Sequence, residues 1–193
     1  MSGEFIIAAV AVAAVGFFVY KKFFKKSDGT APLTIKASDV PSVSASAIPE
    51  GTDGVFLVFS SMEIQPAEGE RLVFNFDAKT INLLESVNQA LIENETVETG
   101  SYEWIRLMVD TSVSYVTLNG GEEGIEIPSA AQTGLKLVSG FTVGEEGADF
   151  TIDFNLDKSL RWDANKRIFR MKPTLKLIDN LKPEEPEEEE PTA

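Results

Sequence analysis

The stretch SYEWIRLMVD, residues 101–110, carries the pattern that decides the fold class. Polar and apolar residues alternate in its second half, where the apolar set opposite Arg106 consists of Ile105, Leu107 and Val109. A period of two residues sends one set of side chains into a core and the other toward solvent, which is typical of a β-strand. Toward the start of the stretch, Tyr102 and Trp104 alternate with Glu103, and we expect Trp104 in the core.

Short apolar runs of the same kind fill most of the middle of the chain. We expect strands at residues 54–66, 70–76, 101–110, 112–118, 124–127, 140–143, 148–156 and 167–179. Turn signals separate these runs at a spacing of roughly ten residues, as in a sandwich or barrel. Residues 82–94 differ, because their leucines and isoleucine recur at helical spacing. The pattern therefore predicts a mainly β domain, a single antiparallel β-sandwich with one short helix.

The composition excludes several kinds of chemistry. The 193 residues include no Cys and no His, which removes disulfides, thiolate nucleophiles, Cys-ligated metals and the usual general base near neutral pH. The net charge of −14 repels phosphate backbones and suits a cationic or divalent partner. We therefore expect no cofactor, and no nucleic-acid contact by the β domain.

The chain begins with an apolar run at residues 5–20, which Phe23 and Phe24 extend past two lysines. With the lysines reaching the interface, a helix of this length can cross a bilayer core of roughly 30 Å. We predict a permanent single-pass membrane anchor at residues 1–26, in preference to a cleaved signal peptide or a buried helix. The anchor residues are Phe5, Ile6, Ile7, Phe17, Phe18, Tyr20, Lys21, Lys22, Lys25 and Lys26.

Small residues follow one face of this predicted helix, where Ala9 and Ala13 lie four apart with Gly16 adjoining. Such residues permit close approach of helices in a bilayer, so the chain is a candidate for self-association into a homo-oligomer. The remaining segments are a polar linker at 27–32, the β domain at 33–179 and a tail at 180–193. The tail ends in PEEPEEEEPTA and is predicted to be disordered, because it has little apolar surface to bury.

Four blocks in the β domain carry a family resemblance. They read G-x-Y-x-x-I-R-L from Gly100, P-S-x-x-x-T-G-L-K-L from Pro128, D-F-x-x-x-K-S from Asp153 and K-P-x-L from Lys172. The positions singled out within them are Tyr102, Arg106, Pro128, Ser129, Gly134, Lys136, Asp153, Phe154, Lys158 and Pro173. By these blocks the domain resembles a bacterial family catalogued as domain of unknown function 4382.

The resemblance implies a β-sandwich of transthyretin-like or immunoglobulin-like kind, with no established activity to carry over. In this family such domains usually follow a lipoprotein signal and lie in the cell envelope, whereas this chain has an apolar run and no lipid-accepting Cys. Four lysines after the run place the domain in the cytoplasm by the positive-inside rule. The resemblance places it on the periplasmic or extracellular side, which we favour.

Arg106 and Asp153 are candidate site residues because they stand within strand-like runs. If both are buried they need partners, so we interpret them as an ion pair or as hydrogen-bonded groups that fix strand register, rather than as a ligand grip. Four aromatic residues could instead form a sugar-stacking platform, with Trp162 as the surface candidate: Tyr102, Trp104, Tyr115 and Trp162.

Three loops are weaker candidates. In PSAAQTG (128–134), Ser129, Gln132 and Thr133 are polar, but nothing nearby activates Ser129, so we interpret the segment as a turn. The acidic loops at 120–124 and 144–149 match no ordered calcium loop, and we interpret them as solvated turns. Asn94 begins a glycosylation sequon, NET.

The expected function is a membrane-anchored, non-enzymatic module of the cell envelope with a structural or interaction role. One alternative is a ligand-binding domain for glycan or a divalent cation. Another is a membrane protein of a virion or similar particle, because the apolar helix followed by KKFFKK is similar to filamentous-phage coat proteins. An enzyme is not expected, since acid–base work would rest on carboxylates alone.

Overall fold

The computed structural model of the chain describes residues 29–39, 48–85, 89–128 and 130–182. The predicted anchor with its packing residues, the first two linker residues and the acidic segment from residue 183 all lie outside this part of the chain. Within the described residues, no helix combines the length and the apolar character that a membrane crossing requires. The predictions of a bilayer anchor and of assembly through it therefore stay predictions.

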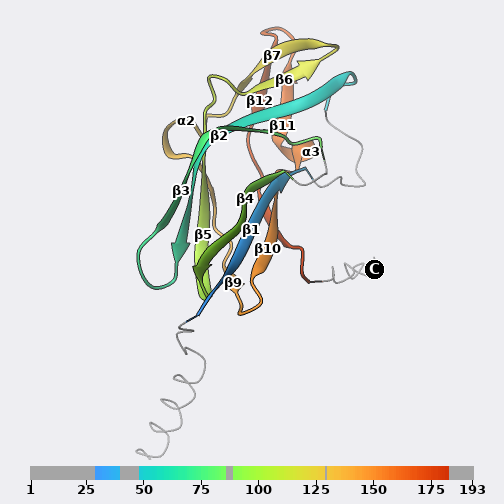
Figure 1. Cartoon of the computed structure of the whole chain (residues 1–193). Helices are drawn as coiled ribbons and strands as arrows, with labels where there is room; N and C mark the ends of the chain where they lie inside the picture. The colour runs from blue at the N-terminus through green and yellow to red at the C-terminus, as the bar shows by residue number, and fades with distance from the viewer. Residues whose placement is uncertain (1–28, 40–47, 86–88, 129, 183–193) are drawn as a thin grey trace, which may run out of the picture.

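The larger of two sheets has nine strands and is built around the long strand β2 (Thr52–Pro66). One edge of β2 pairs with β3, and the other pairs in succession with β6 and β5. The other strands of this sheet are β3 (Leu72–Asn82), β5 (Gly100–Val109), β6 (Tyr115–Leu118), β7 (Gly121–Glu126), β8 (Leu135–Leu137), β9 (Phe141–Val143), β11 (Leu160–Asp163) and β12 (Ile168–Met171). Figure 1 shows β6, β7, β11 and β12 gathered at the end of the molecule opposite to β9.

The smaller sheet has four strands in the order β13–β10–β1–β4. Their bounds are β1 (Thr30–Ser38), β4 (Ala90–Glu98), β10 (Ala148–Asp153) and β13 (Lys176–Asp179). Strand β1 runs antiparallel to β4 but parallel to β10, and in the larger sheet β12 runs parallel to β7. The prediction of an antiparallel architecture is therefore wrong in part, since both sheets are mixed. Alternation within one strand predicts which side chains are buried and says nothing about the direction of a partner distant in sequence.

The two sheets share one hydrophobic core. Leu33 and Ile35 of β1 are fully buried in the same cluster as Phe59 and Met62 of β2. Aromatic contacts also join the layers, because Phe141 of β9 meets Phe150 of β10 edge to face at a centroid distance of 5.0 Å. The described part of the chain is thus mainly β, as predicted, with its apolar strand faces turned toward one another.

The described residues of the helix predicted at 82–94, which are 82–85 and 89–94, do not form a helix. Strand β3 ends at Asn82, whose side-chain oxygen accepts hydrogen bonds from the backbone N–H groups of Val55 and Leu84 at 3.1 and 3.2 Å. Residues 90–94 belong to β4, which pairs with β1 and buries both Leu91 and Ile92. Pairing with a distant strand outweighs the helical spacing of these residues, because both adjacent side chains reach the core at an irregular point of the ladder.

Each of the eight predicted strand segments overlaps an observed strand, and the last contains both β12 and β13. The sequence patterns missed β1, β4, β8 and β11, and β1 begins at Thr30, within the predicted linker at 27–32. The helices of the described residues are single turns at other places than predicted, α2 (Ala130–Thr133) and α3 (Leu156–Ser159).

Candidate functional site

The block from Asp153 to Ser159 builds the turn that carries α3. The buried Asp153 carboxylate accepts from the N–H of Asn155 at 3.0 Å, and the Asn155 side chain caps the helix by accepting from the N–H of Lys158. Ser159 is buried, and its hydroxyl donates to the Phe154 carbonyl at 2.7 Å. These side chains satisfy backbone groups at a sharp change of direction, so the block has a structural role in this chain.

Phe154 and Tyr102 are core residues with defined partners. The fully buried Phe154 ring meets Phe59 edge to face at 6.3 Å. The Tyr102 ring stacks on Phe141 at 5.0 Å, and its hydroxyl donates to the Glu98 carbonyl at 2.6 Å. Burial, and next the charge of Glu98, raise the pKa of the Tyr102 phenol above its usual value. Tyr102 therefore stays a neutral donor at physiological pH.

The block from Pro128 to Leu137 forms α2 and the edge strand β8. Pro128 is exposed in the turn before α2, and Ser129 lies outside the described residues. Gly134 has a backbone φ of +69°, and a Cβ there would lie 2.7 Å from the carbonyl oxygen of Leu107. Only glycine fits this close approach between the α2–β8 turn and β5. The packing here fixes the position of Lys136, the exposed residue at the centre of β8.

Arg106 and Asp153 each have their own partner. Nη1 of Arg106 lies 3.2 Å from Oε2 of Glu63 on the neighbouring strand β2, and the same oxygen lies 2.9 Å from Nη1 of Arg71. Asp153 is held instead by the turn around α3. The two residues do not pair with each other: Arg106 forms an ion pair between strands β5 and β2, whereas Asp153 accepts a hydrogen bond within the turn before α3.

The prediction that Trp104 lies in the core is wrong. Between β2 and β5 the register shifts, so that Gln65 pairs with Trp104 while Pro66 pairs with Tyr102, which leaves Glu103 as an extra residue. Such a bulge reverses the faces of the strand on its two sides. Trp104 therefore shares the outer face of β5 with Arg106 and is half-buried, whereas Tyr102 points inward.

Two cations lie over the half-buried Trp104 ring. Lys136 Nζ is 4.5 Å from the ring centroid and Arg106 Cζ is 5.0 Å from it. Cation–π contacts near the surface stabilise by about 0.5–1 kcal/mol each. Register pairing places Lys136 beside Arg106 and Arg106 beside Glu63 across adjacent strands. We name Trp104, Arg106 and Lys136 the cationic–aromatic cluster.

The donor groups of the cluster are not all used. Arg106 makes its hydrogen bond to Glu63 through Nη1, while its buried Nε has no acceptor among the described residues. The buried Nε is out of reach of a ligand, whereas the exposed Lys136 ammonium and the exposed part of the Arg106 guanidinium suit an anionic acceptor such as a carboxylate or phosphate. The arrangement combines fixed positive charge with a flat apolar surface.

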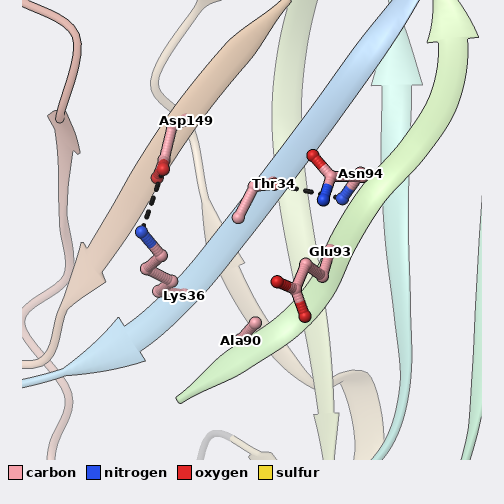
Figure 2. Close-up of a pocket in the computed structure, with 6 residues that line it drawn as sticks. All are labelled: Thr34, Lys36, Ala90, Glu93, Asn94 and Asp149. Carbon is pink, nitrogen blue, oxygen red and sulfur yellow. Dashed lines mark hydrogen bonds and ion pairs between the residues drawn. The ribbon is translucent and has the colours of Figure 1, made fainter. Parts of the chain in front are cut away.

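A second surface feature is an open cavity of about 280 Å³ on the smaller sheet (Figure 2). Its lining residues are Thr34, Lys36, Ala90, Glu93, Asn94 and Asp149. Lys36 Nζ donates to Asp149 at 2.9 Å, and the Asn94 N–H donates to the Thr34 hydroxyl at 3.1 Å. We name this the polar pocket, and its mixture of charged and amide groups suits a small polar ligand.

The polar pocket follows from an irregularity in β4. Leu33 pairs with Glu95 and Ile35 with Ile92, so β4 has one more residue than β1 over this stretch. Asn94 has a positive φ of 52° there, and its exposed side chain belongs to the predicted sequon. No sequence pattern indicated this pocket, because its groups come from three strands.

The other sequence candidates are dispersed. Trp162, the predicted surface aromatic residue, packs on the buried Phe169 ring at 4.6 Å, and Tyr115 stacks on Phe56 at 4.7 Å. The four rings proposed as a sugar platform therefore have separate packing partners. In the acidic loops Glu123 pairs with Arg167, and the second loop closes through a bridge between Gly144 and Gly147. Within the described residues, no group of three or more carboxylates is arranged to hold a metal ion.

Asp39 carries the clearest perturbed carboxyl group. Burial raises its pKa above the ordinary value, and the charges of Asp153 and Asp157 act in the same direction. The N–H of Leu156 donates to its Oδ1 at 2.9 Å, which lowers the pKa by less than burial raises it. Asp39 thus ties the end of β1 to the start of α3 and has a structural role.

Two facing sheets with a charged outer surface define a two-layer, mainly β domain. A family model described as Domain of unknown function (DUF4382) matches residues 30–173, and the chain belongs to this family. The resemblance found in the four sequence blocks is confirmed by this match. A comparison with curated proteins and one with solved structures each found no match.

Proposed function

We propose that the chain is a membrane-tethered, non-enzymatic module of the cell envelope that acts by binding a partner. In this proposal the two sheets form a β-sandwich of transthyretin-like or immunoglobulin-like kind on the periplasmic or extracellular side. The apolar run at residues 5–20 and its flanking lysines support the tether. The family resemblance supports the envelope location.

The observation that carries the binding role is the cationic–aromatic cluster. Tryptophan and arginine are the residues most enriched where proteins bind their partners. Here both lie on the outer face of a sheet, joined by Lys136, on a chain whose net charge is −14. Local positive charge against an acidic background favours contact with an anionic group at this one face.

The binding face can be tested with poly-L-glutamate as an anionic probe and dextran as a neutral one. We expect the full chain in detergent micelles to bind poly-L-glutamate, with loss of binding in an R106E/K136E double variant. The matched control is K166E/K176E, which reverses two exposed lysines outside both the cluster and the polar pocket. Equal binding by the double variant and by the control would show that the cluster is not the binding face.

Self-assembly through the N-terminal helix forms part of the proposal. Large residues introduced at Ala9 and Ala13 prevent close helix approach, so A9L/A13L is expected to dissociate an oligomer of the full chain in detergent. Sedimentation measures the change directly. A full chain that is already monomeric would remove the assembly role and leave the binding role intact.

The side of the membrane on which the domain lies can be tested by protease accessibility. Digestion of the domain in intact cells stripped of their outer barrier is the expected result for a periplasmic or extracellular location. Protection until the inner membrane is lysed would place the domain in the cytoplasm, as the four lysines suggest.

The polar pocket favours a second candidate function, a ligand-binding domain for glycan or a divalent cation. Its hydroxyl, amide and charged groups match the donors and acceptors that recognise sugars. Titration with calcium or neutral glycans is expected to raise the melting temperature in this case. An unchanged melting temperature would remove this candidate. The virion alternative rests on residues outside the described part of the chain and stays a prediction.

A further inference from the structure

We infer that the acidic C-terminal segment, residues 183–193, binds in cis to the cationic–aromatic cluster and competes there with external anionic partners. The inference rests on the proposed function, because it takes the cluster as a binding face. In this inference the chain itself supplies a ligand for the cluster. The segment reads PEEPEEEEPTA and has six glutamates and no basic residue.

Charge complementarity is the first argument. Arg106, Lys136 and the neighbouring Arg71 bring three cations together, and the two arginines share the carboxylate of Glu63. The Arg106 side chain is 28% exposed, and its Nε lacks an acceptor among the described residues. Glutamate carboxylates can accept from the exposed guanidinium and ammonium groups of this face, although not from the buried Nε. Lys136 is exposed and meets the Trp104 ring, which leaves its ammonium accessible to a carboxylate.

The position of the chain at residue 182 is the second argument. Lys182 lines a surface cavity of about 250 Å³ together with Ser139 and Gly140. Lys136 precedes Ser139 by three residues, so at most about 10 Å of extended chain separates the two. The acidic segment therefore leaves the domain beside the strand edge that carries the cluster.

The residues between Lys136 and Ser139 line a further hollow of the surface. A second cavity of about 400 Å³ runs along the exposed edge of β8 and is lined by Lys136, Val138, Pro173 and Leu175 among others. Val138 is 75% exposed there, and it directly precedes Ser139 of the first cavity. Eleven extended residues reach about 36 Å, more than this path requires. A tether of this length gives the segment an effective concentration of about millimolar at the cluster.

Trp104 provides the readout, because Trp162 is the only other tryptophan. In a Trp162→Phe background, fluorescence quenching by iodide reports access to Trp104 for an anion. We expect truncation after Lys182 to raise the iodide quenching constant by about two-fold or more at low salt, since iodide collects at uncovered cations. At about 0.5 M NaCl the full and truncated chains should become equal, because salt screens the contact.

Two controls make the result specific. A full-length chain with all six tail glutamates replaced by glutamine keeps the length and should behave like the truncated chain. A synthetic peptide of residues 183–193, added to the truncated chain, should restore protection of Trp104, and its glutamine version should not. Far-UV circular dichroism of each variant confirms that the domain is folded. If the tail binds in cis, the protection of Trp104 in the full chain should not depend on protein concentration. If a second copy supplies the tail, the protection should rise with concentration.

The outcomes separate the inference from the function on which it rests. Equal quenching in the full, truncated and glutamine-tail chains would overturn the inference. If poly-L-glutamate still binds the cluster in that case, the proposed binding face stands. If neither the tail nor poly-L-glutamate affects Trp104, both are refuted. Protection that rises with protein concentration would replace the cis arrangement by contact between copies.

Discussion

Replacing Gly134 by alanine perturbs the closest approach between the α2–β8 turn and β5. The added methyl group would lie 2.7 Å from the Leu107 carbonyl oxygen and 2.6 Å from the Met108 sulfur. The sulfur can rotate away, but the carbonyl belongs to the backbone of β5 and is fixed by strand pairing with β2 and β8. The substitution also places a Cβ on a residue with a φ of +69°.

The expected loss in the free energy of unfolding has two parts, and a second glycine with a similar backbone conformation separates them. A left-handed backbone costs an L-residue about 1–2 kcal/mol. Overpacking a tight contact adds about 1–3 kcal/mol, so the free energy of unfolding should fall by about 2–5 kcal/mol in Gly134→Ala. Gly120 has a similar φ of +75°, and a methyl group added there would meet no other described part of the chain within 4 Å. Gly120→Ala should therefore cost only the backbone part, about 1–2 kcal/mol.

Urea denaturation of the full chain, followed by tryptophan fluorescence, measures both variants on the same transition. A difference of about 1–3 kcal/mol between Gly134→Ala and Gly120→Ala is the expected signature of the contact with Leu107. The spectrum of Trp104 should also change in Gly134→Ala alone, because a displaced β8 moves Lys136 away from the ring. Equal losses in the two variants, with an unchanged spectrum, would refute the reasoning.

Three further predictions concern stability and its pH dependence. Ser159→Ala removes the hydroxyl that serves both the Phe154 carbonyl and the Thr174 N–H, and should lower the free energy of unfolding by about 1–3 kcal/mol in urea; a loss below about 0.5 kcal/mol would contradict this. Asp39 has a raised pKa when folded, so its carboxyl group costs stability as pH rises from 3.8 through the raised value. Asp39→Asn should therefore stabilise the protein at neutral pH and flatten this part of the curve of melting temperature against pH, and an unaltered curve would count against it. Tyr102→Phe loses the hydrogen bond to Glu98 but keeps the stacking on Phe141, so it should cost about 1 kcal/mol, against about 3–5 kcal/mol for Tyr102→Ala; similar losses in both would contradict this.

Alternation predicted most of the strands because local patterning and burial agree in them. In β3, for example, Leu72, Phe74 and Phe76 face the core side while Val73 and Asn75 are exposed. Strand β4 was missed because its core residues Leu91 and Ile92 are adjacent, which only an irregular ladder allows. The direction of β1 relative to β10 had no local signal either, because the two strands are separated by more than a hundred residues.

The candidate site was harder to predict than the fold. Arg106 and Lys136 appear in the sequence as separate motif positions, and only the β5–β8 register makes them neighbours. Regular alternation from Val109 back to Ile105 places Trp104 on the face of Arg106, and the prediction erred by giving Trp104 the same face as Tyr102. The two residues lie on opposite sides of the bulge at Glu103, which is decided by pairing with β2 and has no signal within residues 101–110.

The position of β1 has a mechanical consequence. This strand lies between β4 and β10 in the smaller sheet, and the chain enters it directly from the segment that precedes Thr30. A pull transmitted through that segment acts along the strand axis, so it loads the hydrogen bonds to both neighbours in shear and must break them together. A strand at a sheet edge would peel away one bond at a time. In the proposed tethering, the domain would thus be held through an internal strand of its smaller sheet and not through an edge strand.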